Sequence, residues 1–122
     1  MRIQFTAQEL FFENDGDVAY ANLMGGDGGE PEHFLIFQRG LTDDDQAIHL
    51  EYNDQSNGAY DAIASCHLDG ERLTVDLARP LGALTDVTGF DVSLALDDED
   101  KQAELAAALT LIFQDTALLQ IH

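Results

Sequence analysis

The sequence predicts an α+β fold: a mostly antiparallel, meander-like sheet with one long helix near the C-terminus packed on one face, in a single domain spanning residues 1–122. Three observations predict it. Apolar and polar residues alternate along the first two-thirds of the chain, between turn-forming residues, as they do in half-buried strands. One long helical pattern follows an acidic run at residues 97–100. Apolar residues make up 45% of the chain, which is enough for a core.

The N-terminal half is predicted to contribute strands that turn back on one another. Residues 3–7 alternate apolar with polar side chains, residues 10–12 are apolar, and the Asn-Asp-Gly-Asp run at 14–17 is a turn signal before a strand at 18–23. Residues 33–39 are a continuous apolar run with polar ends. This run predicts a strand near the centre of the sheet that is buried on both faces.

A hairpin is the most regular predicted element. A two-residue loop at residues 69–70 pairs Cys66 with Leu73 and His67 with Arg72, so that apolar side chains share one face and Cys66 becomes a small core residue. Turn chemistry and hydrophobic pattern therefore predict the same register.

The C-terminal third is predicted to form a strand, a helix and a docked tail. The strand covers residues 87–96 and the helix runs from about Asp98 to Phe113. The tail at 117–121 is apolar, so we expect it to dock as a short strand or a last helical turn. One helix cannot cover both faces of a large sheet, so either the sheet bends over itself or a partner chain, possible in a homodimer, covers the second face.

Charge is the strongest compositional signal. The chain has 24 acidic and five basic residues, a formal net charge of −19. Such a protein repels phosphate backbones and anionic membranes, and it attracts basic partners. We therefore expect no nucleic acid and no membrane among its partners. An Asp-rich, Lys-poor surface is also typical of a high-salt habitat, and that alternative stays open.

The cysteine count and the N-terminal sequence bear on location. The chain has one cysteine, so an internal disulfide is excluded and a reducing compartment suits it. The first residues lack the apolar run of a signal peptide, and no stretch has the length of a membrane span. The sequence therefore predicts a cytoplasmic protein.

Catalytic chemistry has little support in the sequence. His33, His49 and His67 lie in predicted strands, and His49 shares a face with Glu51 and Asn53. The chain has no HxH, HExxH or Cys/His cluster and no nucleophile motif, so we predict no catalytic residues, no metal and no cofactor. The alternative that stays open is a small metal-dependent hydrolase using His49, Glu51 and His67.

Several segments resemble a known family. Residues 18–22 (VAYAN), 30–39 (EPEHFLIFQR), 53–55 (NDQ) with 58–60 (GAY), and 111–113 (LIF) are similar to the immunity protein 10 family of bacterial polymorphic-toxin systems. The Glu-Pro-x-His-aromatic-Leu-x-x-Gln-Arg run is the specific part. The chain departs from the usual pattern in a Gly-rich insertion at 25–29 and in Asp61. The resemblance implies a small cytoplasmic protein that binds and blocks a cognate toxin without catalysis.

The leading hypothesis is thus an immunity protein that occludes a toxin, such as a basic nuclease-type domain, through an acidic surface. The residues inferred from charge to bind the partner are Glu30, Glu32, Asp43, Asp44, Asp45, Asp54, Asp97, Asp98 and Asp100. The polar residues of the family motif, whose role the sequence leaves open, are His33, Gln38, Arg39, Asn53 and Gln55. We expect Arg39, one of the few basic residues, to pair with a carboxylate. A non-catalytic homo-oligomeric module is a further alternative.

Overall fold

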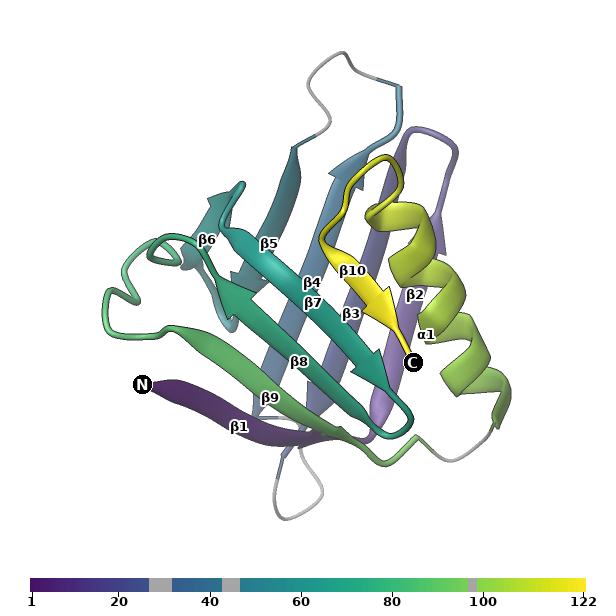
Figure 1. The fold of residues 1–122 in the computed structure, drawn as a ribbon, viewed down its shortest axis with the longest axis horizontal. Helices are drawn as coiled ribbons and strands as arrows, with labels where there is room; N and C mark the ends of the chain where they lie inside the picture. Colours follow the sequence, from purple (N-terminus) through teal and green to yellow (C-terminus); the bar gives the residue numbers. More distant parts are fainter. Residues whose placement is uncertain (27–31, 43–46, 97–98) are drawn as a thin grey trace.

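The computed structural model describes residues 1–26, 32–42, 47–96 and 99–122, which form ten strands and one helix in two layers (Figure 1). The elements, in chain order, are β1 (Arg2–Ala7), β2 (Glu9–Asn14), β3 (Val18–Gly25), β4 (His33–Gly40), β5 (Ile48–Tyr52), β6 (Asp54–Tyr60), β7 (Ile63–Asp69), β8 (Arg72–Leu77), β9 (Gly89–Leu94), α1 (Glu99–Ile112) and β10 (Leu119–Ile121). The predicted α+β class, with mostly antiparallel strands and a helix near the C-terminus, is confirmed.

Sheet B is an antiparallel meander of five strands in the order β2-β3-β4-β5-β6. Its central strand is β4, as the apolar run at 33–39 predicts, but the prediction that both faces of this strand are buried is wrong. Leu35 and Phe37 are fully buried, whereas Ile36 between them is half-buried and Gln38 is exposed. The strand alternates because only one face of the sheet is covered.

Sheet A contains the other five strands, in the order β1-β9-β8-β7-β10. The predicted hairpin is present as β7 and β8, but its register differs by two residues from the prediction. Cys66 pairs with Val75 and His67 with Thr74, because the loop consists of Gly70 and the residue after it, with Gly70 at φ 56°. From Ser65 to Leu68 a shift of two keeps the side chains on their predicted faces, so Cys66 is buried as expected. An irregularity between Ile63 and Ser65 leaves Ala64 exposed and Ile63 buried.

The two edge strands of sheet A come from opposite ends of the chain. Both β1 and β10 pair parallel to their neighbours, β9 and β7 respectively. The tail is therefore a docked strand, one of the two forms predicted for it. These pairings join distant segments, which is why the alternation of side chains does not reveal them.

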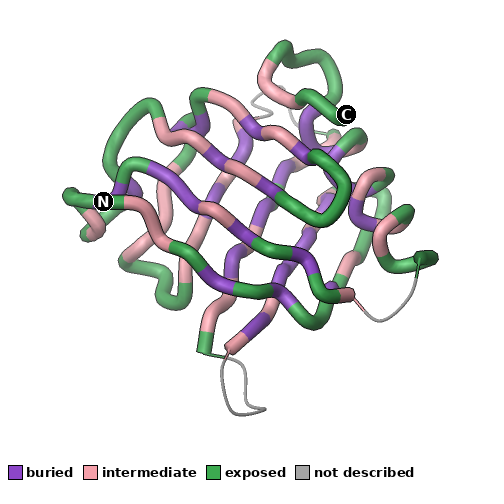
Figure 2. The backbone as a smooth tube through the Cα atoms, turned by 60° about the horizontal axis from the view of Figure 1, so that its bottom comes forward, coloured by how far each residue is buried: buried purple, intermediate pink, exposed green. Residues whose placement is uncertain are grey.

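The core lies between the two layers. Purple buried segments alternate with exposed ones along the strands in Figure 2. The helix α1 lies beside β10 and packs against β2, β3 and β4, so it extends the layer of sheet A over the part of sheet B that sheet A leaves open (Figure 1). It buries Leu105, Ala108, Leu109 and Ile112, and Phe113 directly after the helix is also buried. The second sheet thus supplies the cover that one helix alone could not.

Candidate functional site

Asn53, a residue of the family motif, holds the start of β4 against the end of β5. Its φ is 64°, a left-handed conformation that asparagine tolerates. The side-chain oxygen accepts a hydrogen bond from the Phe34 amide at 2.7 Å, and the side-chain nitrogen donates to the Glu32 carbonyl at 3.0 Å. Asn53 therefore closes this end of the sheet, and its contacts are structural.

The side chain of His33 also makes contacts within the fold. Its ring stacks on Phe5 with centroids 4.8 Å apart, and its Nδ1 lies 2.6 Å from the Tyr52 hydroxyl. Tyr52 in turn packs against Phe90. Burial raises the pKa of Tyr52, so its hydroxyl stays protonated and acts as a hydrogen-bond partner. The histidine thus joins β1 of sheet A to β4 and β5 of sheet B.

Arg39 caps the end of the helix. The side chain is 5% exposed, and its Nη1 donates to the carbonyl oxygens of Ile112 at 2.7 Å and Gln114 at 2.5 Å. These carbonyls belong to the end of α1, where the helix dipole favours a positive charge. Two contacts of Arg39 are therefore with main-chain carbonyls, and the carboxylate partner expected from the sequence stays a prediction.

Gln38 and Gln55, the remaining motif residues, are both exposed. Gln38 lies on the uncovered face of β4, and Gln55 lies in β6. The structure thus divides the motif into residues that hold the fold and residues that face outward.

The acidic residues selected from charge are only partly placed. Glu32, Asp54 and Asp100 are exposed. Asp54 accepts hydrogen bonds from the amide and hydroxyl of Ser56, and these bonds lower its pKa. Glu32 and Asp54 flank the Asn53 corner of sheet B, whereas Asp100 lies in the first turn of α1. Glu30, Asp43, Asp44, Asp45, Asp97 and Asp98 lie outside the described residues.

The proposed hydrolase constellation does not form. His49 and Glu51 lie on β5 of sheet B, and His67 lies on β7 of sheet A. The neighbours of each histidine along its strand point into the core, so the two rings project from opposite outer surfaces of the sandwich. Over the described residues, no group of three or more His, Cys, Asp or Glu side chains has the geometry of a metal site.

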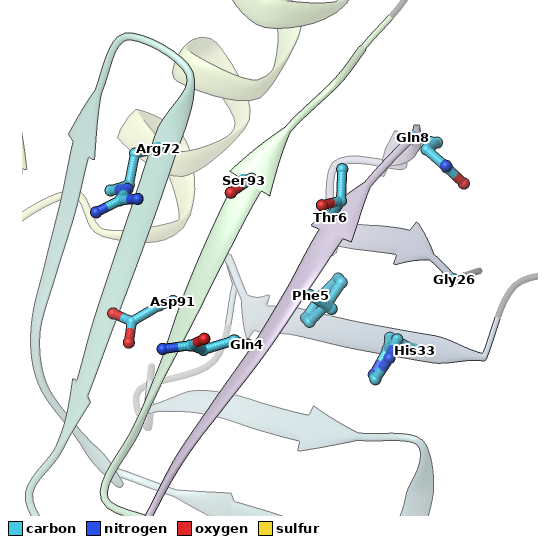
Figure 3. Close-up of a pocket in the computed structure, with 9 residues that line it drawn as sticks. All are labelled: Gln4, Phe5, Thr6, Gln8, Gly26, His33, Arg72, Asp91 and Ser93. Atoms are coloured by element: carbon cyan, nitrogen blue, oxygen red, sulfur yellow. The ribbon is translucent and has the colours of Figure 1, made fainter.

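A polar cleft of about 620 Å³ runs along the edge strand β1 (Figure 3). The lining residues are Gln4, Phe5, Thr6, Gln8, Gly26, His33, Arg72, Asp91 and Ser93. Two of its ionisable groups have partners within the fold: Asp91 forms a salt bridge with Arg2 at 2.9 Å, and the His33 ring lies 2.6 Å from the Tyr52 hydroxyl. The third, Arg72, acts on Asp91 through its charge. The guanidinium of Arg2 lowers the pKa of Asp91. The cleft therefore shows charge pairs of the fold, without a nucleophile beside a base.

The outer face of sheet B is the surface that the second layer leaves open. Its central residues point away from the core and form two rows across the strands: Glu13, Tyr20, Gln38, His49 and Tyr60 in one row, and Phe11, Asn22, Ile36, Glu51 and Gly58 in the other. Phe11 and Tyr60 are 50% and 62% exposed. The sequence analysis did not predict that these two side chains are exposed. The position of Phe11 between the inward-facing Leu10 and Phe12 does indicate that its side chain points outward.

The molecule is thus a two-layer β-sandwich whose buried polar groups hold the fold and whose open face combines aromatic and acidic side chains. Exposed aromatic side chains among polar ones are typical of surfaces that contact a partner protein. The family model described as Immunity protein 10 matches residues 6–104, and the chain belongs to this family. A search of curated proteins finds no match. Within the described part of the chain, no helix is long and apolar enough to cross a membrane.

Proposed function

We propose that the protein neutralises a cognate toxin by forming a stoichiometric complex with it. The observation that carries this proposal is the family match over residues 6–104, since immunity proteins protect a cell by binding a toxin. The protein would act without catalysis, in the cytoplasm of the cell that makes the toxin or of its kin.

The chemistry of the chain favours a basic toxin. A net charge of −19 attracts a positively charged domain over a long range and speeds its capture. A nuclease domain that binds nucleic acid has such a positive surface. The protein would then occlude the surface by which the toxin reaches its phosphate-bearing substrate.

Co-expression tests this proposal. The toxin domain encoded by the reading frame next to this gene is expressed with and without the protein in a sensitive host, and the purified pair is examined by sedimentation. We expect restored growth and a 1:1 complex whose affinity falls as salt rises. Failure to restore growth, together with no complex at micromolar concentration, would overturn the proposed function.

A further inference from the structure

We propose that the toxin docks on the outer face of sheet B, and that an arginine of the toxin enters the hollow that Phe11, Glu13 and Tyr20 line. This inference rests on the proposed function and adds the surface and the chemistry of the contact. It differs from the selection made on charge, because the anchors are aromatic side chains in strands and the carboxylates surround them.

Exposed aromatic rings lie on both edge strands of this face. Phe11 on β2 is 50% exposed and packs edge-on to Tyr20, with ring centroids 6.0 Å apart. Tyr60 on β6 is 62% exposed and lies 4.7 Å from His49, centroid to centroid. Large aromatic side chains held rigid by neighbouring rings are the usual anchors of protein interfaces. Exposed aromatic rings contribute little to the stability of the fold, so contact with a partner explains their position better.

A hollow of about 390 Å³ lies at the β2–β3 side of this face. It is lined by Phe11, Glu13, Asp15, Val18, Tyr20 and Gln38. Asp15 accepts hydrogen bonds from the amides of Asp17 and Val18, which lower its pKa and keep it ionised. Two aromatic rings beside two carboxylates form a site for a guanidinium, which stacks on rings and pairs with carboxylates.

The charge of the two outer faces differs. Among the strands of sheet B, Arg39 is the only basic residue, and it points into the core. The outer face of sheet A instead pairs its charges, since Arg2 bonds both Asp76 and Asp91. Lys101 on α1 lines a separate hollow together with Phe11 at the β2 edge of this face, and its charge is paired with Glu104 at 3.4 Å. The sheet B face is therefore the one that complements a basic protein.

A buried acceptor on this face lacks a donor within the described residues. Asn22 is 9% exposed and projects outward between Phe11 and Ile36, yet its Oδ1 accepts no hydrogen bond there. Burial raises the pKa of the neighbouring Tyr20, and Glu51 and Glu13 raise it further against the opposing effect of Asn22. This oxygen has almost no solvent-accessible surface, so a donor from a docked partner would satisfy it only after the side chains that cover it shift.

A second copy of this chain is a poor occupant of the face. Two molecules of charge −19 would bring the same carboxylates, Glu13 and Glu51, against one another without a basic residue from either sheet B face. The charge pattern therefore favours a partner of opposite sign over self-association.

The test compares matched variants of the two outer faces against the toxin domain from the adjacent reading frame. On sheet B the variants are Phe11→Ala, Tyr60→Ala and Glu13→Gln. On sheet A the controls are His67→Ala, which removes a ring stacked on His122, and Asp69→Asn at the exposed hairpin tip. All five side chains are at least partly exposed, so the fold is retained, and urea unfolding of each variant verifies this.

We expect Phe11→Ala and Tyr60→Ala each to raise the Kd about thirtyfold or more. Glu13→Gln should raise it about tenfold, mainly through slower association and a weaker salt dependence. The Kd of the controls should stay within about threefold of the wild-type value.

If the wild type binds and protects while the sheet B variants bind as tightly as the controls, the docking surface is wrong and the proposed function stands. If the wild type forms a dimer that Phe11→Ala separates without a change in toxin affinity, the face serves self-association and the inference is overturned. If the wild type does not bind the toxin, the proposed function itself fails.

Discussion

Replacing Arg39 by methionine should strongly destabilise the fold. The guanidinium is buried and donates to two main-chain carbonyls at the end of α1, at 2.7 and 2.5 Å. A hydrogen bond to a charged group contributes about 1.5–3 kcal/mol, and the variant leaves both carbonyls without this donor. Methionine retains most of the apolar stem and recovers part of the packing. We therefore expect the free energy of unfolding to fall by about 3–5 kcal/mol.

Urea unfolding followed by far-ultraviolet circular dichroism measures this loss at pH 7. Arg79→Met is the matched control, because Arg79 is exposed in the segment after β8 and should change the free energy of unfolding by less than about 0.5 kcal/mol. The helix should also exchange its last amide protons faster in the Arg39 variant, because its C-terminal carbonyls lose their cap. A loss below about 1 kcal/mol for Arg39→Met would refute the view that this residue stabilises the helix end.

Three further predictions concern stability and reactivity. Gly82→Ala should lower the free energy of unfolding by about 2–4 kcal/mol, because Gly82 has φ 59° and an added Cβ would lie 2.2 Å from the Ser56 carbonyl oxygen. The control Gly16→Ala, at φ 91° in open space, should lower it by about 1 kcal/mol. Equal thermal shifts of the two variants would contradict a steric clash at Gly82. Burial raises the pKa of the Cys66 thiol to about 12, so iodoacetamide at pH 8 should label the native protein on the order of a hundredfold more slowly than the protein in urea, and equal rates would place the thiol at the surface. Arg2→Gln should lower the free energy of unfolding by about 1 kcal/mol at pH 7. Because Arg2 lowers the folded-state pKa of Asp91, this difference from the wild type should persist down to about pH 4 and shrink below it. A difference that is constant down to pH 2 would exclude the Arg2–Asp91 ion pair as its source.

The alternation of side chains predicted faces more reliably than it predicted partners. It placed His49, Glu51 and Asn53 opposite the core and Cys66 inside it, and both placements are confirmed. A period of two fixes the face of a residue but leaves open which strands pair. Three features therefore came only from the structure: the division into two sheets, the parallel pairing of β1 and β10, and the two-residue shift of the hairpin.

The candidate surface was harder to predict for a related reason. Aromatic residues in a strand normally count as core, so Phe11 and Tyr60 do not reveal their exposure until the covered face is known. Acidic runs are visible in any sequence, which is why charge dominated the first selection. The motif residues Asn53, His33 and Arg39 turned out to bond within the fold, because a recurring polar residue can serve structure as well as recognition.

Methyl NMR of the complex tests the docking surface most directly. Ile36 lies on the outer face of sheet B, whereas Ile121 on β10 is exposed in sheet A and Ile48 is buried in the core. When the unlabelled toxin domain is titrated into protein labelled at isoleucine methyl groups, the account predicts a large shift or broadening at Ile36 and little change at Ile121. A complex that perturbs Ile121 and leaves Ile36 unchanged would contradict it.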